Sequence, residues 1–315
     1  MIMLDDIHSA RRRIEGRVKR TPLVSSQTLS RRLGAQVYLK LELLQKTGSF
    51  KVRGAFNKVL SIPEGQRGRG LVAVSGGNHA QAVAYAAGQL GLASVIFMPE
   101  KTPRNYVDAT RGYGAEVILV SNANEGFQKV EAFEKDGWTA IHPFDDPLVI
   151  AGQGTVGLEI VEDLPEVTDV VASIGGGGFI GGVASAVKLS KSEARVWGVE
   201  TVGAETMSKA LAAGHPVQLD AITSIARTLG APSVTERTLR LAQNYLESVT
   251  VVPDSEAMNA LRFLLERAKV LAEPAAACTL AAAEHLRRHF HPESKVVLVL
   301  CGGNVALDDI CGYKT

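Results

Sequence analysis

Residues 40–55 read KLELLQKTGSFKVRGA, and Lys51 in this stretch is the most informative residue of the chain. An apolar run before it predicts a strand at residues 36–41, and the residues after it predict the start of a helix. A lysine inside a Gly-Ser-Phe turn between two such elements is poorly explained as a solvated surface charge. Gly48 and Ser49 leave room beside the side chain, which favours a reactive amine held near a bound group.

Three polar turns follow downstream of Lys51. Residues 75–79 read SGGNH, residues 175–178 read GGGG, and residues 301–304 read CGGN, each after a run rich in β-branched residues. Unhindered backbone N–H groups at the start of a helix attract phosphates and carboxylates. A reactive amine, an asparagine-bearing turn, a glycine phosphate cradle and a polar strand end are the parts needed to hold pyridoxal phosphate.

The glycine run supports a second interpretation. Residues 176–181 match the pattern GxGxxG, and Glu200 closes the next expected strand, as in the dinucleotide fingerprint with its ribose-binding acid. An NAD-dependent oxidoreductase therefore remains an alternative, and so does a tight turn that binds nothing. Lys51 and the two other turns favour the phosphate of pyridoxal phosphate at Gly175, Gly176, Gly177 and Gly178.

The order and spelling of these motifs resemble the threonine dehydratase and serine racemase family of fold-type II pyridoxal-phosphate enzymes, from about Thr21 to the C-terminus. The resemblance implies an α/β fold of the tryptophan synthase β type, with two interleaved lobes that each hold a mostly parallel twisted sheet covered by helices. Residues 1–68 and 146–315 would form the large cofactor-binding lobe, and residues 69–145 the small inserted lobe. It also implies a homodimer.

The resemblance further implies roles for individual residues. Lys51 would bond to the cofactor and later remove the substrate Cα proton as general base. The other implied cofactor contacts are Phe50, Asn78, Gly175, Gly176, Gly177, Gly178, Glu273 and Cys301. The implied substrate contacts are Ser75, Gly76, Asn78 and His79, with Phe144 and Arg227 as further candidates. Taken alone, Asn78 is also a plausible helix N-cap and Glu273 an exposed helix-start carboxylate.

Cys301 ends the expected strand at residues 295–300, where the family has serine or cysteine facing the pyridine nitrogen. A buried free cysteine is ordinarily only a small hydrophobic residue. In the implied position, a neutral thiol cannot keep the pyridine nitrogen protonated as an aspartate would. The ring is then a weaker electron sink, which favours β-elimination over transamination.

Departures from the family pattern refine the expected activity. Gly76 stands where the racemases have a serine that delivers a proton, so racemisation is disfavoured. The chain stops at Thr315, so we expect no regulatory domain. Glu200 and the Ala204 carbonyl align with a cation site, but Thr206 replaces its second acid, which leaves a divalent cation undecided. Arg227 replaces an acidic residue and either shapes substrate choice or pairs with Glu205 or another acid.

Composition adds few constraints. The formal net charge of +1 gives no reason to expect nucleic acid or an anionic membrane as partner. Three cysteines without a CxxC pair argue against a disulfide framework or a structural zinc. The first residues lack a secretory signal pattern, and no apolar run approaches membrane-spanning length, so we expect a cytoplasmic protein.

Alternating β-branched runs and helical segments predict a parallel sheet covered by helices. The expected strands are residues 36–41, 70–74, 93–98, 116–120, 170–174, 195–199 and 295–300. The expected helices include residues 4–16, 79–90, 103–113, 124–136, 154–163, 179–189 and 254–268.

The predicted function is a lyase that eliminates water from a β-hydroxy-α-amino acid, such as threonine, serine or a 3-substituted serine. The products would be a 2-oxo acid and ammonia. The alternatives are serine racemisation and dehydration of 3-hydroxyaspartate or phenylserine, with the NAD-dependent oxidoreductase more distant.

Overall fold

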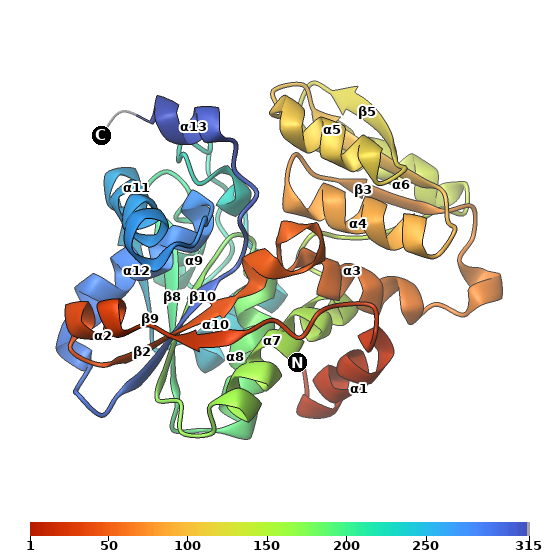
Figure 1. The fold of residues 1–315 in the computed structure, drawn as a ribbon. Helices are drawn as coiled ribbons and strands as arrows, with labels where there is room; N and C mark the ends of the chain where they lie inside the picture. Colours follow the sequence, from red (N-terminus) through yellow and green to blue (C-terminus); the bar gives the residue numbers. More distant parts are fainter. Residues whose placement is uncertain (314–315) are drawn as a thin grey trace.

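Two mostly parallel sheets form the framework of the molecule (Figure 1). The structure is a computed structural model that describes residues 1–313, without the side chains of residues 66, 307 and 308. The larger sheet has the strand order β1-β2-β10-β7-β8-β9, and only the β1–β2 pair is antiparallel. Its strands are β1 (Leu23–Ser25), β2 (Gln36–Leu41), β7 (Asp169–Ser173), β8 (Arg195–Thr201), β9 (Ser248–Val252) and β10 (Lys295–Leu300).

The smaller sheet is wholly parallel and has the order β5-β4-β3-β6. Its strands are β3 (Leu71–Val74), β4 (Ser94–Pro99), β5 (Glu116–Val120) and β6 (Thr139–Ala140). All four lie within residues 69–145, the segment proposed as an inserted lobe. The boundaries of that lobe remain a proposal, because buried residues of the preceding helix, such as Val52 and Phe56, share one apolar cluster with the smaller sheet.

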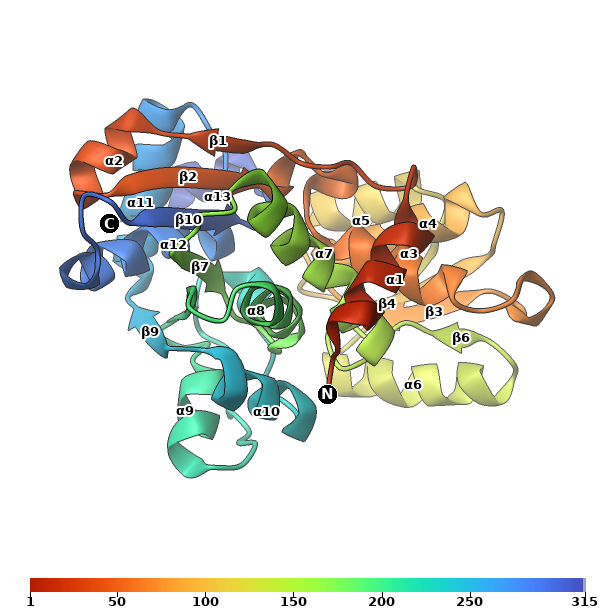
Figure 2. The same ribbon diagram turned by 90° about the horizontal axis from the view of Figure 1, so that it is seen from below.

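The helices cover both faces of the sheets, as Figures 1 and 2 show from two directions. They are α1 (Leu4–Ile14), α2 (Gln27–Leu33), α3 (Lys51–Leu60), α4 (Asn78–Gln89), α5 (Arg104–Gly112), α6 (Ala123–Lys135), α7 (Pro147–Asp163), α8 (Gly178–Ser190), α9 (Thr206–Ala213), α10 (Glu236–Tyr245), α11 (Asp254–Phe263), α12 (Pro274–His285) and α13 (Leu307–Gly312). None of the helices in the described part of the chain is long and apolar enough to span a membrane.

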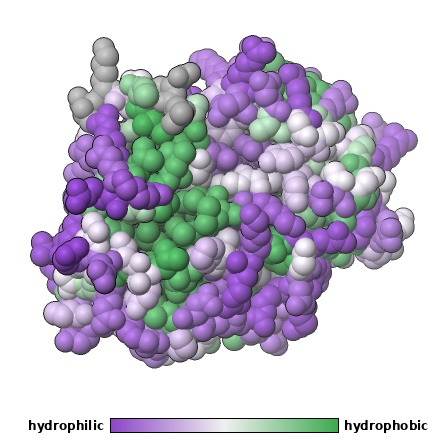
Figure 3. Space-filling model, in the orientation of Figure 1, coloured by the Kyte–Doolittle hydropathy of each residue, from purple (hydrophilic) through white to green (hydrophobic). Residues whose placement is uncertain are grey.

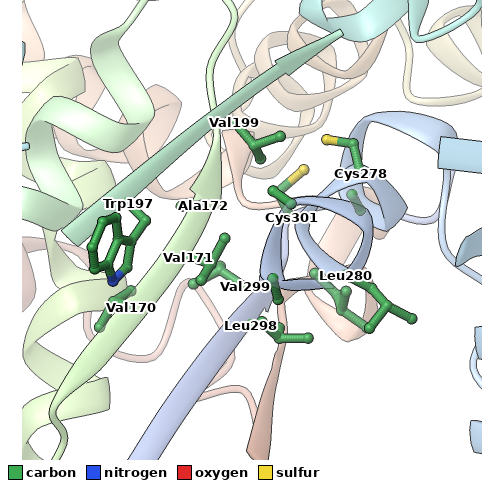
Figure 4. Close-up of a cluster of buried hydrophobic side chains, with 14 of the residues drawn as sticks. Val170, Val171, Ala172, Trp197, Val199, Cys278, Leu280, Leu298, Val299 and Cys301 are labelled. Carbon is green, nitrogen blue, oxygen red and sulfur yellow. The ribbon is translucent and has the colours of Figure 1, made fainter. Parts of the chain in front are cut away.

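The core lies around the central strands of the larger sheet, and Figure 4 shows part of it. Residues 296–300 of β10 are fully buried, which explains why this strand is a continuous apolar run instead of an alternating one. Helices α8 and α12 are apolar on all sides because every residue in 178–187 and in 274–283 is buried. Covered on both faces, the sheet directs its functional side chains to the strand ends.

All seven expected strands are present, three of them with the predicted bounds. Helix α7 begins at Pro147, seven residues before the expected start. Its first turn carries an ordinary start signal, since the Asp146 carboxylate accepts from the N–H groups of Leu148 and Val149. The glycines of this helix obscure the pattern: a side chain at Gly152 would meet the backbone of α3, and one at Gly157 the backbone of α8.

A buried cluster of four charged residues ties α3 to the larger sheet and to α7. The Arg53 guanidinium donates to both Glu42 and Glu159, with N···O distances of 2.6–2.9 Å. The Lys40 amine donates to Glu159 at 2.6 Å and to the Thr21 carbonyl at 2.7 Å. Arg53, Lys40 and Glu42 are completely buried. Burial alone would raise the pKa of Glu159, but Arg53 and Lys40 hold it below its ordinary value.

We predict that Arg53→Met destabilises the fold by about 3–5 kcal/mol, because it leaves two buried carboxylates without their partner. The free energy of unfolding, measured in urea, gives the loss. Arg20→Met is the matched control: Arg20 also contacts two acids, Glu162 and Asp163, but at the surface. It should cost about 1 kcal/mol or less. Equal losses in the two variants would contradict a special role for the buried cluster.

Candidate active site

Lys51 is the first residue of α3. The turn that precedes it is hydrogen-bonded to the segment that follows β10. Ser49 forms an antiparallel bridge with Gly302, and the Phe50 N–H donates to the Cys301 carbonyl at 3.1 Å. Thr47 adopts a positive φ of 64°, which is uncommon for a residue with a β-branched side chain. The fold therefore places Lys51 at a strand end, although the two segments are far apart in the sequence.

The Lys51 amine lies in an enclosed, partly apolar environment. It donates to the Pro143 carbonyl at 2.6 Å and lies 5.3 Å from the centroid of the Phe50 ring. Burial lowers the pKa of Lys51 to about 8, although the nearby Cys301 and Glu273 oppose this shift. At pH 7 about one amine in ten is then neutral, against about one in three thousand for an ordinary lysine. The amine is suited to act as nucleophile and base.

The glycine run lies beside this turn. The Phe50 ring stacks on Phe179, with centroids 3.9 Å apart and the planes inclined by 23°. Gly177 has a φ of +88° and precedes the first turn of α8. In the described part of the chain, the N–H groups of Gly175, Gly176 and Gly177 have no protein acceptor. Free N–H groups at a helix N-terminus are suited to bind an anion.

Close packing against Phe144 also requires glycine in this run. A side chain at Gly176 would overlap the ring of Phe144, and one at Gly178 would overlap the backbone of Phe144. Phe144 therefore lies against the glycine run, near the Lys51 amine that bonds to its neighbour Pro143. The structure brings Phe144 to the candidate site.

Asn78, the first residue of α4, and Glu273, which precedes α12, meet in the structure. The Asn78 amide donates to the Glu273 carboxylate at 2.9 Å, and its oxygen accepts from Asn304 at 2.8 Å. The N-cap of α4 is Gly77, so the interpretation of Asn78 as the N-cap is wrong. The interpretation of Glu273 as an exposed carboxylate is also wrong, because only 2% of it is exposed. Burial raises the pKa of Glu273 to about 7, against hydrogen bonds from Thr228 and Asn78.

Cys301 is buried at the end of β10, as expected. Its Sγ lies 3.4 Å from the hydroxyl oxygen of Ser173 at the end of β7. Burial raises the pKa of the Cys301 thiol well above its ordinary value, so the group stays neutral. Figure 4 shows Cys301 beside Cys278, whose pKa burial raises as well. Both thiols therefore lack the thiolate character of a reactive cysteine.

Residues 75–77 connect β3 to α4, and Asn78 and His79 form the start of that helix. The Ser75 hydroxyl accepts from the Gly77 N–H at 3.1 Å and closes the turn. His79 is buried, and its Nε2 lies 2.8 Å from the Ile141 carbonyl, which makes Nε2 the protonated nitrogen. Burial lowers the pKa of His79 to about 3, so the ring is neutral. The turn presents donors to an anion without adding a full charge.

Arg227 is exposed in the 3-10 turn Arg227–Leu229, next to Thr228, which donates to Glu273. A Cβ built on Gly77 would lie 3.4 Å from Thr228 Cγ2, so Arg227 is next in the chain to a residue of the candidate site. The alternative that Arg227 pairs with Glu205 is wrong: Glu205 pairs with Lys209 at 2.9 Å. Sequence reasoning missed Tyr106, whose hydroxyl donates to the Asn304 carbonyl and so connects α5 with the loop after β10.

The residues of the possible cation site have other partners. Glu200 accepts from the N–H groups of Met207 and Ser208 and from the Ser208 hydroxyl, and so caps α9. Burial raises the pKa of Glu200 to about 7. The Thr206 hydroxyl donates to the Ala231 carbonyl at 2.7 Å. Among the described residues, no three His, Cys, Asp or Glu side chains gather as metal ligands would, and Ala204 offers only its carbonyl.

Known proteins resemble the chain over nearly its whole length. The L-threonine ammonia-lyase of Thermotoga maritima is 43% identical, over 98% of this chain and 77% of the relative. The catabolic L-threonine dehydratase of Escherichia coli K12 is 36% identical, over 98% and 95%. Maize serine racemase superposes with a TM-score of 0.94 at 34% identity, covering 98% of this chain and 96% of that one. The threonine deaminase of T.th. gives a TM-score of 0.90 at 39% identity, covering 97% and 99%.

These structural neighbours confirm the predicted fold class, and the family match decides against the dinucleotide interpretation of the glycine run. The model of the family described as "pyridoxal-phosphate dependent enzyme" matches residues 14–302. The chain belongs to the pyridoxal-phosphate dependent enzyme family.

Proposed function

We propose that this enzyme eliminates water from a β-hydroxy-α-amino acid, with L-threonine as first candidate, and releases a 2-oxo acid and ammonia. The observation that carries the proposal is the Lys51 amine, enclosed, with a pKa lowered to about 8, beside the glycine run. Threonine ammonia-lyases and dehydratases among the relatives support the reaction type and the substrate. We also propose that the enzyme works in the cytoplasm.

The residues present fit pyridoxal phosphate. Its phosphate needs donors without side chains in the way, and the N–H groups of residues 175–177 supply them. Its aldehyde needs a partly neutral amine, which Lys51 supplies. The Cys301 thiol, which is proposed to face the pyridine nitrogen, is neutral and would leave that nitrogen unprotonated, as β-elimination favours. Asn78 is held in place by Glu273 and Asn304 and is the proposed donor to the phenolate oxygen.

When bound, pyridoxal phosphate supplies an electrophilic carbon for the amino group and a ring that withdraws electrons from Cα. The protein residues do the remaining work. The backbone N–H groups of Gly76, Asn78 and His79 hold the substrate carboxylate, whereas the Ser75 N–H is already used by the Phe97 carbonyl. Lys51 takes the proton from Cα as general base, and this proton and the departing β-hydroxyl together make up the water that is lost. Hydrolysis of the released unsaturated product, which consumes one water, gives the 2-oxo acid and ammonia. Phe50 and Phe144 enclose the reacting atoms and exclude bulk water.

Serine racemisation is the second candidate, favoured by the similarity to maize serine racemase. Racemisation requires a proton donor on the face opposite Lys51. Gly76 has no side chain to provide one, so we propose elimination with little racemisation. Dehydration of 3-hydroxyaspartate or phenylserine shares the same reacting atoms and differs only in the side-chain pocket.

We further propose a homodimer. Figure 3 shows an area of hydrophobic residues beside α11 and below α13. Among the large hydrophobic residues of the chain, Leu44 and Leu265 are exposed, at 46% and 37%. A contiguous apolar area of this kind fits a contact with a second copy.

We predict that Lys51→Ala folds but neither develops the visible absorbance of the bound cofactor nor forms 2-oxo acid from threonine, serine, phenylserine or 3-hydroxyaspartate. The amine is the only group proposed to take the Cα proton, so the loss should be about 1,000-fold or more. Lys46→Ala, a nearby lysine outside the proposed machinery, is the matched control and should retain both properties. Turnover of Lys51→Ala at the wild-type rate would refute the proposed mechanism.

The pH dependence of cofactor capture tests the lowered pKa of Lys51. Only the neutral amine attacks an aldehyde, so below about pH 8 the rate of binding by the apoprotein should rise about tenfold per pH unit and level off above it. The amine of N-acetyl-lysine, measured with the same reagent, should keep rising beyond about pH 9. If the rate of cofactor binding by the apoprotein rises in parallel with the rate for N-acetyl-lysine up to about pH 10, the pKa of Lys51 is that of an ordinary lysine.

We predict that Arg227 affects which substrate the enzyme prefers. If its guanidinium faces the substrate, Arg227→Ala should lower kcat/KM for 3-hydroxyaspartate by about tenfold more than for threonine, because a charged hydrogen bond contributes about 2 kcal/mol. Lys209→Ala, also basic but paired with Glu205 away from Thr228, is the control. Equal small losses across the substrates would place Arg227 outside the recognition site.

A further inference from the structure

Gly76 faces a hydroxyl group that belongs to another loop. A Cβ atom built on Gly76 would lie 2.7 Å from Thr102 Oγ1, 3.5 Å from Pro99 Cδ and 3.7 Å from Thr102 Cβ. The hydroxyl oxygen is thus the nearest atom outside the 75–77 turn. The space that a side chain at position 76 would use is already occupied by the hydroxyl of Thr102.

The fold holds Thr102 in this position. Strands β3 and β4 are parallel neighbours, with Val74 opposite Phe97, so their following loops leave the sheet at the same edge. The Ser75 N–H donates to the Phe97 carbonyl at 3.1 Å, and the Thr102 N–H donates to the Pro99 carbonyl at 2.8 Å. Both loops are therefore anchored to the sheet before they meet.

The surrounding groups are unpaired donors. Among the residues that the structure describes, the N–H groups of Gly76, Asn78 and His79 have no protein acceptor. The hydroxyl of Thr102, which is half-buried, has no hydrogen-bond partner in the same set of residues. These donors lie at the N-terminus of α4, where the helix dipole favours a negative charge.

We propose that Thr102 binds the carboxylate of the amino-acid substrate through its hydroxyl group, beside the amides of residues 76–79. This inference rests on the proposed function, since it assigns a further residue to the same substrate site. A hydroxyl has a rotating proton, so it can donate to a carboxylate oxygen that the fixed amides do not reach. It is too weak an acid to move protons in the reaction, so Thr102 determines substrate affinity and not the chemical step.

Contact with the Thr102 hydroxyl explains why position 76 is a glycine. A methyl group there would push on the Thr102 hydroxyl, since real Cβ atoms essentially never approach a heavy atom within 3.0 Å. The φ of Gly76 is outside the left-handed region, so alanine meets no backbone strain there. A conflict between Gly76→Ala and Thr102 is therefore a steric effect that removal of the hydroxyl should relieve.

The test uses the holoenzyme and two properties: the dissociation constant of L-alanine, which has no β-hydroxyl to eliminate, and the kinetics with L-threonine. Thr102→Val keeps the branched shape without the hydroxyl and should raise the dissociation constant and KM by about tenfold or more, with kcat within about twofold. Thr102→Ser, the matched control, keeps the hydroxyl and should remain within about threefold of wild type. The alanine dissociation constant is read from the visible spectrum and does not depend on turnover.

A double-mutant cycle covers the case in which Thr102→Val fails to fold. Gly76→Ala alone should weaken L-alanine binding by about tenfold, but it should add little to Thr102→Ala, which leaves space for the methyl group. Unchanged affinity in Thr102→Val or Thr102→Ala, or an equal effect of Gly76→Ala in both backgrounds, would overturn the proposal. The proposed function itself would fail if the wild-type protein showed neither visible absorbance nor formation of 2-oxo acid. That result is distinct from the outcomes for the Thr102 and Gly76 variants.

Discussion

The buried ionic cluster around Arg53 is the constraint on which the candidate site depends. Arg53 lies two residues after Lys51 in the first turn of α3, and its guanidinium binds two carboxylates that come from different elements, Glu42 after β2 and Glu159 in α7. Lys40 adds a second cation to Glu159. A planar guanidinium that binds two acids with paired hydrogen bonds permits few orientations of the helix start. The position of Lys51 follows from that orientation.

Burial sets the charge state of the groups around Lys51. It lowers the pKa of Lys51 to about 8 and that of His79 to about 3, and it raises the pKa of Glu273 to about 7. The pKa of the Cys301 thiol is raised as well. Each group is moved toward its neutral form, because the protein interior disfavours isolated charges. A site of this kind binds an anionic cofactor and substrate through backbone amides and leaves the reacting amine free to exchange a proton.

Much of the fold was predictable from local sequence, because strands buried on both faces leave an unbroken apolar run. Strand β10 was predicted for this reason, and β9 was missed because its residues are mostly half-exposed. The glycine-rich turns also made it possible to predict which segments of the chain form the site. Contacts between distant segments were not: Asn78 and Glu273 are 195 positions apart, and the capping of α9 by Glu200 leaves no local signal. The contact between Thr102 and Gly76 was not predictable either, since only the fold brings the Thr102 hydroxyl to Gly76.

The covalent attachment point of the cofactor tests the role of Lys51 most directly. The holoenzyme is reduced with borohydride, digested and analysed by mass spectrometry. We predict one pyridoxyl phosphate per chain, on the peptide that contains Lys51. Label on another lysine, or an active enzyme that carries no label after reduction, would contradict it.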